Sequence, residues 1–336
     1  MAFINNESNI LVTGGAGFIG SNFILHLLSN EEFQGAVVNV DKLSYAANLE
    51  NLDDISDHPR YKFYEEDIQN KDQIEKICID HKIDLIVNFA AETHVDNSIE
   101  DPKPFLMSNV IGTLSLLEVV RAYPNIHFHH ISTDEVFGEL GSEGSFSEES
   151  PYKPNSPYAA SKASSDHLVR SYIKTYKISA TVSNCCNNYG PRQHTEKLIP
   201  KIIENLINKE HLPIYGVGEN SREWIFVEDH SRALLIVLKH GKKGESYNIG
   251  SGIEMNNLEL VQKIIEKYCK IANENLVECV DLIRFVPDRP GHDFRYFLNC
   301  EKIKSLGYST KYSLEEALEA TINFTLNKKC LVDFKA

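Results

Sequence analysis

The sequence predicts an α/β protein with a doubly wound parallel sheet and a smaller, mixed α/β lobe. In the first half of the chain, short apolar runs alternate with helical patterns. This alternation is typical of parallel βαβ units, because a parallel connection must cross over the sheet. After about Thr181 the pattern loosens and five prolines interrupt it. The 336 residues are enough for one large domain or two smaller ones.

The expected elements follow one another in the order that such a sheet requires. We expect strands at residues 9–13, 36–40, 85–89 and 128–132, with helices at 18–29, 72–81 and 105–122. Further helices are expected at 198–208, 227–240 and 257–270, and residues 178–185 still resemble a strand of the main sheet. Residues 1–185 should therefore form the larger domain, residues of about 222–250 should return to it, and most of 186–336 should form the smaller lobe.

Composition and charge exclude several classes of function. The net charge of −14 argues against general nucleic-acid binding, which needs a basic surface. An anionic small ligand is still compatible if a few Lys and Arg gather in one cleft. Seven cysteines without CxxC spacing predict reduced thiols, and neither they nor the thirteen histidines suggest a metal site. The polar N-terminus, with no apolar run near ~20 residues, predicts a cytoplasmic protein without a membrane segment.

A glycine-rich turn follows the first expected strand. Glycines at 14, 17 and 20 give the spacing G-x-x-G-x-x-G where the strand ends and a helix begins. Glycine lets a diphosphate approach the backbone, and the helix directs free N–H groups and its positive dipole end at that anion. Asp41 ends the second strand, about 20 residues downstream, as in the dinucleotide fingerprint. These features predict a Rossmann-type domain that binds NAD, since Asp41 would repel the 2′-phosphate of NADP.

Two acids of this region have a plainer alternative. Asp41 could only cap a turn, although its context favours hydrogen bonds to ribose hydroxyls. Asp67 follows the strand-like residues 61–64 and could face the adenine, but it could equally be an ordinary loop acid.

Tyr158 and Lys162 form a Tyr-x-x-x-Lys pair. At this spacing both side chains lie on one face of a helix. The Lys162 ammonium and the positive charge of a nicotinamide should stabilise tyrosinate and lower the pKa of the phenol. Tyr158 could then take a proton from a sugar hydroxyl while hydride leaves the same carbon. The pair occurs by chance in many helices, and it gains weight here from the glycine turn.

Thr133, Asp134 and Glu135 follow the strand at 128–132. Residues at the carboxyl end of such a strand face the cofactor, and Thr133 could hydrogen-bond the same sugar oxygen as Tyr158. Two successive acids could simply lie in a solvated loop or at a helix N-terminus, where the dipole favours them. Beside a hydride-transfer site they indicate acid–base chemistry instead.

Together these motifs resemble the extended short-chain dehydrogenase/reductase family, and within it the dTDP-glucose 4,6-dehydratases. The resemblance covers nearly the whole chain and includes residues 13–23, 41–45, 89–99, 132–139, 158–167, 187–192, 196–200 and 288–293. Asp134-Glu135 discriminates, because related epimerases resemble Ser-Ser-x there and GDP-mannose dehydratases resemble Thr-Ser-Glu. The chain departs from the pattern at Cys185-Cys186 and at residues 192–195, which could tune loop packing near the sugar.

The resemblance implies a hydro-lyase of deoxysugar biosynthesis, such as that of rhamnose, which forms a 4-keto-6-deoxy sugar from dTDP-glucose. Tyr158 would remove the C4 hydroxyl proton as hydride passes to NAD, Glu135 would remove the C5 proton, and Asp134 would protonate the leaving C6 hydroxyl. Hydride would then return to C6, so NAD would be retained. Helices 105–122 and 156–176 would form the four-helix bundle of a homodimer, although their apolar faces could simply pack on the sheet.

Two other functions and the choice of nucleotide stay open. A nucleotide-sugar epimerase or decarboxylase shares the glycine turn and the Tyr-x-x-x-Lys pair but does not need Asp134 beside Glu135. A non-catalytic nucleotide sensor would be expected to lose Tyr158 or Lys162, and this chain keeps both. The sequence does not discriminate firmly between dTDP and UDP.

The resemblance also supplies sets of binding residues. The expected cofactor site consists of Gly14, Gly17, Phe18, Ile19, Gly20, Asp41, Lys42, Ser44, Asp67, Ile68, Ala90, Ala91, Thr93, Ser108, Tyr158, Lys162 and Asn187. The expected substrate site consists of His94, Thr133, Asn187, Glu196, Lys197, Leu198, Arg222, Asn257, Arg289, His292 and Tyr296. Arg222 and Arg289 could offer bidentate contacts to a diphosphate, although each alone is more often a surface residue.

Overall fold

A parallel sheet forms the centre of the protein, seen here in a computed structural model that describes residues 2–288 and 290–333. Within these residues its strands are β1 (Ile10–Thr13), β2 (Val37–Asp41), β3 (Tyr61–Glu65), β4 (Leu85–Asn88), β5 (His127–Thr133), β6 (Ala180–Cys185) and β10 (Ser246–Ile249). They run parallel in the order β10-β6-β5-β4-β1-β2-β3. The chain therefore winds outward from β1 in both directions, which confirms the predicted doubly wound sheet.

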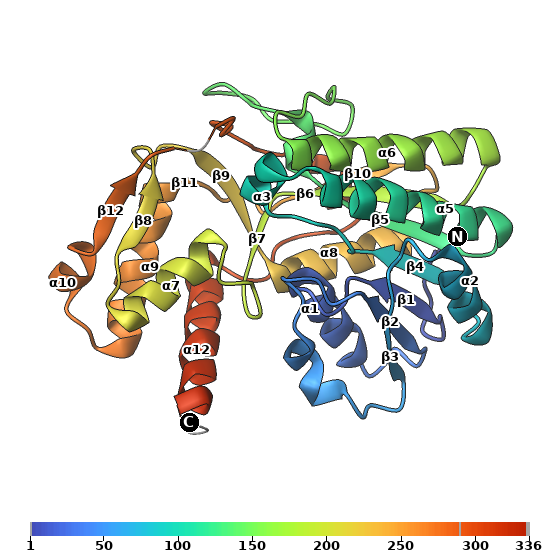
Figure 1. Cartoon of the computed structure of the whole chain (residues 1–336), viewed down its shortest axis with the longest axis horizontal. Helices are drawn as coiled ribbons and strands as arrows, with labels where there is room; N and C mark the ends of the chain where they lie inside the picture. The colour runs from blue at the N-terminus through green and yellow to red at the C-terminus, as the bar shows by residue number, and fades with distance from the viewer. Residues whose placement is uncertain (1, 289, 334–336) are drawn as a thin grey trace.

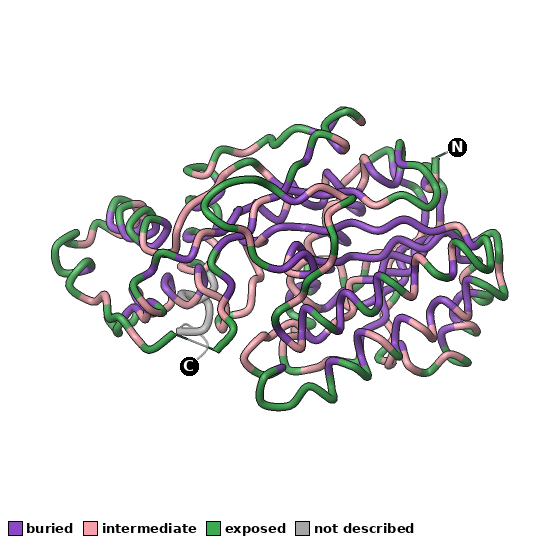
Figure 2. The backbone as a smooth tube through the Cα atoms, turned by 90° about the horizontal axis from the view of Figure 1, so that it is seen from above, coloured by how far each residue is buried: buried purple, intermediate pink, exposed green. Residues whose placement is uncertain are grey.

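Helices cover both faces of this sheet (Figure 1). One face carries α1 (Phe18–Leu28), α8 (Val227–His240) and α11 (Glu301–Lys304), and the other carries α2 (Lys71–Asp80), α5 (Thr113–Ala122) and α6 (Pro157–Tyr176). Side chains alternate between the faces: Ile10 and Val12 pack with the first set, and Leu11 packs with the second. All three are fully buried, and Figure 2 shows the strands as a buried layer between partly exposed helices.

The helical segment expected at 105–122 is longer and less regular than predicted. It begins at α4 (Lys103–Phe105), continues through the π-helical turn η2 (Leu106–Gly112) and ends with α5. By length and composition, Lys103–Ala122 is apolar enough to cross a membrane, which corrects the expectation that no run approaches that length. Half of it is buried inside the fold, where α5 packs on the sheet, so its hydropathy is that of a core helix.

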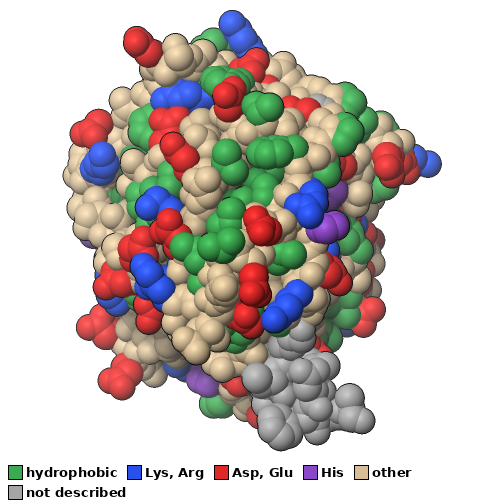
Figure 3. Space-filling model, turned by 90° about the vertical axis from the view of Figure 1, so that its left-hand side faces the viewer, with side chains coloured by type: hydrophobic (Ala, Val, Ile, Leu, Met, Phe, Trp, Pro, Cys, Tyr) green, Lys and Arg blue, Asp and Glu red, His purple; other side chains and the backbone are tan. Residues whose placement is uncertain are grey.

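The smaller lobe has its own core. β7 (Asn187–Tyr189), β9 (Ser221–Phe226) and β11 (Glu254–Asn256) form one small sheet, and β8 (Leu212–Tyr215) pairs with β12 (Ile283–Val286). The helices α7 (Leu198–Asn208), α9 (Asn257–Ala272), α10 (Leu276–Val280) and α12 (Leu314–Asp333) pack with these strands. The face of the protein drawn in Figure 3 shows hydrophobic side chains among charged ones, and Val217 and Phe285 are exposed apolar residues of this lobe. Three short elements remain, namely η1 (Leu49–Ile55), α3 (Val95–Glu100) and η3 (Asp134–Phe137).

Candidate active site

One cavity runs along the carboxyl ends of the parallel strands, where ligands of such sheets bind. Every residue predicted for the cofactor lines it, from the glycine turn after β1 to Asn187 after β6. The predicted catalytic residues Thr133, Asp134 and Glu135 line it as well. The fold thus brings three separate sequence motifs to one cavity, because each follows a neighbouring strand or begins the helix beside it.

Glycines let the turn before α1 pack closely against neighbouring backbone. Gly14 has a φ of +70°, and a Cβ there would lie 2.6 Å from the backbone nitrogen of Ala90. A Cβ at Gly20 would lie 2.4 Å from the carbonyl oxygen of Gly14. No described side chain caps α1 at Gly17, and its first turn contains no acid. The N–H groups and positive dipole end of α1 are therefore available to an anion such as a diphosphate.

Asp41 supports the glycine turn directly. One carboxylate oxygen accepts a hydrogen bond from the N–H of Ala16 at 3.0 Å, and the other accepts one from the N–H of Leu43 at 2.9 Å. Burial raises the pKa of this carboxyl, while the two backbone N–H groups oppose that shift. Asp41 does cap a turn, as the plainer alternative held, and it also lines the cavity where ribose hydroxyls would reach its remaining lone pairs.

Lys42 brings a positive charge to the same end of the cavity. Its ammonium group donates a hydrogen bond to Ser108 Oγ at 2.6 Å and lies 3.3 Å from Glu92 and 4.0 Å from Asp67. Asp67 is partly exposed and accepts hydrogen bonds from Gln69, so its contact with an adenine stays a prediction.

Helix α6 places Tyr158 and Lys162 on its buried face. Ser156 caps the helix by accepting a hydrogen bond from the N–H of Ala159, and Pro157 occupies the first turn, where proline is favoured. The N–H of Tyr158 donates to Ser98 Oγ at 3.1 Å, which holds α6 against α3. The Lys162 ammonium donates to the carbonyl oxygen of Ile131 at 2.7 Å.

The expected lowering of the Tyr158 pKa is not a property of the chain alone. Burial and the Glu135 carboxylate raise the pKa of this phenol, and a hydrogen bond from Thr133 opposes them. The sequence prediction named two positive charges, Lys162 and a nicotinamide, and the Lys162 ammonium is held by the backbone of β5. A lowered pKa therefore needs the charge of a bound ligand in addition to that of Lys162.

Asp134 and Glu135 begin η3 directly after β5, in different environments. Asp134 is 2% exposed, and its Oδ2 has no hydrogen-bond partner among the described residues. Its Oδ1 accepts a hydrogen bond from Thr133 Oγ1 at 3.2 Å. Burial raises the pKa of Asp134 well above its usual value, and the carboxylates of Glu135 and Glu223 raise it further. Glu135 is only half-buried, so the two adjacent carboxyls differ in environment: burial favours the protonated form of Asp134, and Glu135 is more accessible.

Several predicted substrate residues meet at the mouth of the cavity. The carboxylate of Glu196 lies 3.7 Å from His94 Nε2, 3.6 Å from His194 Nδ1 and 3.5 Å from the ammonium of Lys197. The phenol of Tyr45 also donates to Glu196, at 3.3 Å. These contacts join loops that follow β2, β4 and β7.

Among the described residues that were predicted for the substrate, six do not line the cavity, namely His94, Leu198, Arg222, Asn257, His292 and Tyr296. Leu198 and Asn257 are the first residues of α7 and α9, and His292 lies 2.6 Å from Asp288. Arg222 is buried on β9, where its guanidinium donates to backbone carbonyls and lies over the ring of Tyr296 at 4.5 Å. Arg289 lies outside the described residues. Contacts of this group with a diphosphate or sugar stay predictions.

Sequence reasoning missed part of the cavity wall. Cys185 at the end of β6, Cys186 directly after it and Asn188 on β7 line it, and Gln193 and His194 line it farther along the chain. The rule that strand ends face the ligand would have found the first two. Both cysteines are buried, and burial raises the pKa of the Cys185 thiol to about 12, which agrees with the predicted inert thiols.

Comparison with known proteins assigns this architecture to a family. The family model of GDP-mannose 4,6 dehydratase matches residues 11–321. The chain is 47% identical to a dTDP-glucose 4,6-dehydratase of Neisseria gonorrhoeae over 96% of this chain and 97% of that relative. This chain belongs to the nucleotide-sugar 4,6-dehydratase family.

Solved structures of the family agree with this assignment. A dTDP-glucose 4,6-dehydratase of Bacillus anthracis in complex with NAD superposes with a TM-score of 0.87 and 44% identity, covering 96% of this chain and 97% of that one. DesIV, a dTDP-glucose 4,6-dehydratase of Streptomyces venezuelae with NAD and TYD bound, gives a TM-score of 0.89 and 40% identity, covering 96% and 98%.

Proposed function

We propose that this protein is an NAD-dependent dTDP-glucose 4,6-dehydratase, which forms dTDP-4-keto-6-deoxy-glucose. The observation that carries the proposal is the buried Asp134 beside Glu135 in the cavity that also holds Tyr158. Oxidation at C4 alone, as in an epimerase, needs only the tyrosine. Loss of water from C5 and C6 needs one group that takes a proton and another that gives one, and the adjacent acids supply both.

The residues of the cavity fit NAD. Without a Cβ, Gly14 and Gly20 pack closely against the backbone of Ala90 and Gly14, and α1 begins there without a side-chain cap, where a diphosphate would lie. Asp41 would bind the ribose, and its charge disfavours a 2′-phosphate. NAD supplies the hydride acceptor for oxidation at C4 and the hydride donor for reduction at C6, and its nicotinamide carries the positive charge that Tyr158 needs.

Each catalytic residue has one proton to move. Tyr158 takes the proton of the C4 hydroxyl, with Thr133 as its hydrogen-bond partner. The resulting 4-keto group acidifies the proton at C5, which Glu135 removes, and C5 would be reprotonated when hydride returns to C6. Asp134, kept neutral by burial, protonates the C6 hydroxyl so that it leaves as water. Glu196 and Lys197 would hold the sugar and diphosphate at the mouth of the cavity.

Product analysis tests this function. The purified protein is incubated with dTDP-glucose and, separately, UDP-glucose, without added NAD. Because NAD is retained, we expect a 4-keto-6-deoxy product without added cofactor. We expect it to form faster from dTDP-glucose. Tyr158→Phe is the matched control and should form none. Conversion of UDP-glucose to UDP-galactose without loss of water would instead identify an epimerase.

The oligomer is proposed to be a homodimer through a four-helix bundle. On η2, Leu106 is 50% exposed, and Met107 and Ile111 are each about two-fifths exposed. The segment of η2 and α5 packs beside α6 (Figure 1), and the outer face of η2 carries these exposed apolar side chains. A second copy of that face would cover them. Light scattering at micromolar concentration should report a dimer, and a monomer would contradict this interface.

A cytoplasmic location is proposed on the state of the cysteines. The described ones, Cys78, Cys185, Cys186, Cys269, Cys279 and Cys300, are all free and buried. Free thiols are typical of reducing compartments.

A further inference from the structure

Behind the catalytic residues, a carboxylate lies one helical turn after Lys162. Asp166 is fully buried and follows Tyr158 and Lys162 at successive four-residue steps on the same face of α6. Lys162 and Asp166 also reach adjacent residues of β5. The Lys162 ammonium donates to the carbonyl oxygen of Ile131 at 2.7 Å, and the Asp166 carboxylate accepts from Ser132 Oγ at 2.7 Å. This arrangement keeps the two charges close without a direct ion pair.

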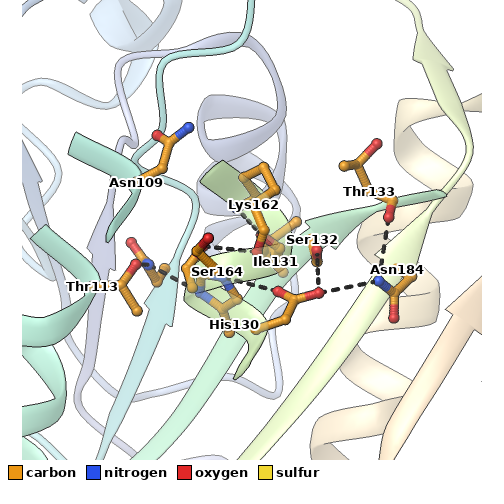
Figure 4. A network of polar contacts seen from close by, with 12 residues as sticks. Asn109, Thr113, His130, Ile131, Ser132, Thr133, Lys162, Ser164 and Asn184 are labelled. Atoms are coloured by element: carbon orange, nitrogen blue, oxygen red, sulfur yellow. Dashed lines mark hydrogen bonds and ion pairs between the residues drawn. The ribbon is translucent and has the colours of Figure 1, made fainter. Parts of the chain in front are cut away.

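The surroundings of Asp166 favour its ionised form. Tyr152 donates its hydroxyl to Oδ2 at 2.8 Å and itself accepts a hydrogen bond from Arg170. On the other side, His130 Nε2 lies 3.4 Å from Oδ1. Figure 4 shows His130, Ser132 and Lys162 within one network of contacts. A buried carboxylate with this many donors is expected to keep its charge.

The proton of His130 is placed by the next residue of the network. Asn88 donates its amide to His130 Nδ1 at 3.1 Å, while its Oδ1 accepts from Thr13 Oγ1 at 2.6 Å. His130 Nδ1 must then be an acceptor, so a neutral imidazole carries its proton on Nε2, facing Asp166. Burial lowers the pKa of His130 to about 4, which leaves it neutral at pH 7.

We propose that Asp166 is a positioning residue for the reaction, a buried negative charge that keeps Lys162 protonated and thereby favours the tyrosinate form of Tyr158. The groups that act on Lys162 from neighbouring elements are Asp166 on α6, His130 on β5 and Cys185 on β6. His130 and Cys185 are neutral at pH 7, since burial raises the pKa of that thiol to about 12. Burial of Lys162 opposes its charge, and Asp166 offsets that effect.

The test is the pH profile of kcat for Asp166→Asn and, in parallel, for Asp166→Ser, a smaller neutral side chain. Without the carboxylate, Lys162 should lose its proton at lower pH. The alkaline limb of the profile should move down by about one to two pH units, as expected when a nearby unit charge is removed from a partly screened interior. Tyr152→Phe is the matched control, because it removes a neutral donor to the same carboxylate and should leave the alkaline limb in place.

A second readout does not depend on turnover. The tyrosinate absorbance of Tyr158 is taken as the difference between each protein and its Tyr158→Phe counterpart. If only the Asp166 charge is lost and Lys162 stays protonated, the midpoint of that titration should fall. If Lys162 loses its proton as well, the midpoint should rise. Folded Asp166 variants with an unmoved alkaline limb and a lowered tyrosine midpoint would overturn the proposal.

This inference rests on the proposed function, and the two can fail separately. A wild-type protein that forms no 4-keto-6-deoxy sugar refutes the function, while the tyrosine titration still tests Asp166. If the wild-type protein forms the product and the Asp166 variants keep the wild-type pH profile of kcat, only the role of Asp166 is refuted.

Discussion

Replacement of Asp134 by Asn tests the assignment of the general acid. Asparagine keeps the shape of the side chain but has no proton to give to the leaving hydroxyl. Asp134 is 2% exposed, and burial raises its pKa well above the usual value, which favours the protonated form that a general acid needs. General acids contribute about 10²–10⁴-fold, and we expect the upper part of that range. A loss of about 10³–10⁴-fold corresponds to roughly 4–5 kcal/mol of barrier.

The assay separates water loss from the first oxidation. Single-turnover absorbance of NADH follows the oxidation, which depends on Tyr158 and should change less than about tenfold. Product analysis follows the loss of water, so reduced cofactor should accumulate in Asp134→Asn. Asp53→Asn, on the exposed side of η1, is the control and should match the wild type. Turnover of Asp134→Asn within tenfold of the wild type would refute the assignment.

Three further predictions concern hydride transfer, the cofactor turn and acid stability. Tyr158→Phe should lower the rate of NADH formation by about 10²–10⁴-fold in single turnover, with NAD content unchanged. Gly14→Ala should lose bound NAD and melt earlier, because a left-handed backbone costs about 1–2 kcal/mol and the new Cβ meets Ala90. Burial lowers the pKa values of His127 and His230 to about 3. The unfolded state therefore takes up protons below pH 6.5 that the folded state refuses, and each histidine should cost about 2 kcal/mol by pH 5 in urea unfolding. Equal stability at pH 7 and pH 5 would contradict this last prediction.

The sequence predicted the helices and strands that are marked by a pattern within their own residues. Helices α7 and α8 lie at the predicted bounds because each has a continuous apolar face, and the parallel strands were marked by short buried runs. The three-residue strands β7 and β11 were missed, since their pairing partner β9 is far away in sequence. The π-helical turn η2 was missed for a similar reason. Its Asn109 exchanges hydrogen bonds with the backbone of Glu92, a contact that no helical periodicity reveals.

The residues of the candidate site also fall into those that the sequence predicted and those that it did not. The glycine turn, Asp41 and the acids after β5 were found because strand ends converge at one edge of the sheet. Motif spacing could not show that Arg222 would be turned into backbone contacts with Asp293 and its neighbour. Asp166 carried a usable signal, the four-residue step after Lys162, but its meaning depends on Ser132 and on burial that only the folded chain defines.

Asp134 and Asp166 show how one sheet edge sets opposite protonation states, and this gives a final prediction for stability. Asp134 has few donors and lies near Glu135, so its pKa is raised in the folded state. Above pH 3.8, the usual pKa of an Asp, folding therefore opposes its ionisation. Burial also opposes the ionisation of Asp166, but His130, Lys162 and Ser132 outweigh it, so the pKa of Asp166 is lowered in the folded state. Its contribution to stability is present above pH 3.8 and is lost as pH falls through the folded value.

The two Asn substitutions should therefore act in opposite directions. At pH 7, Asp134→Asn should raise the urea midpoint, because it removes a buried group that the folded state resists ionising. Asp166→Asn should lower the midpoint, because it leaves the Lys162 ammonium without its counter-charge in a buried site. The difference between the variants should shrink as pH falls below about 4, where both carboxyls of the unfolded chain become protonated. Midpoints that shift in the same direction at pH 7 would show that burial alone, and not the pattern of donors and charges, determines both protonation states.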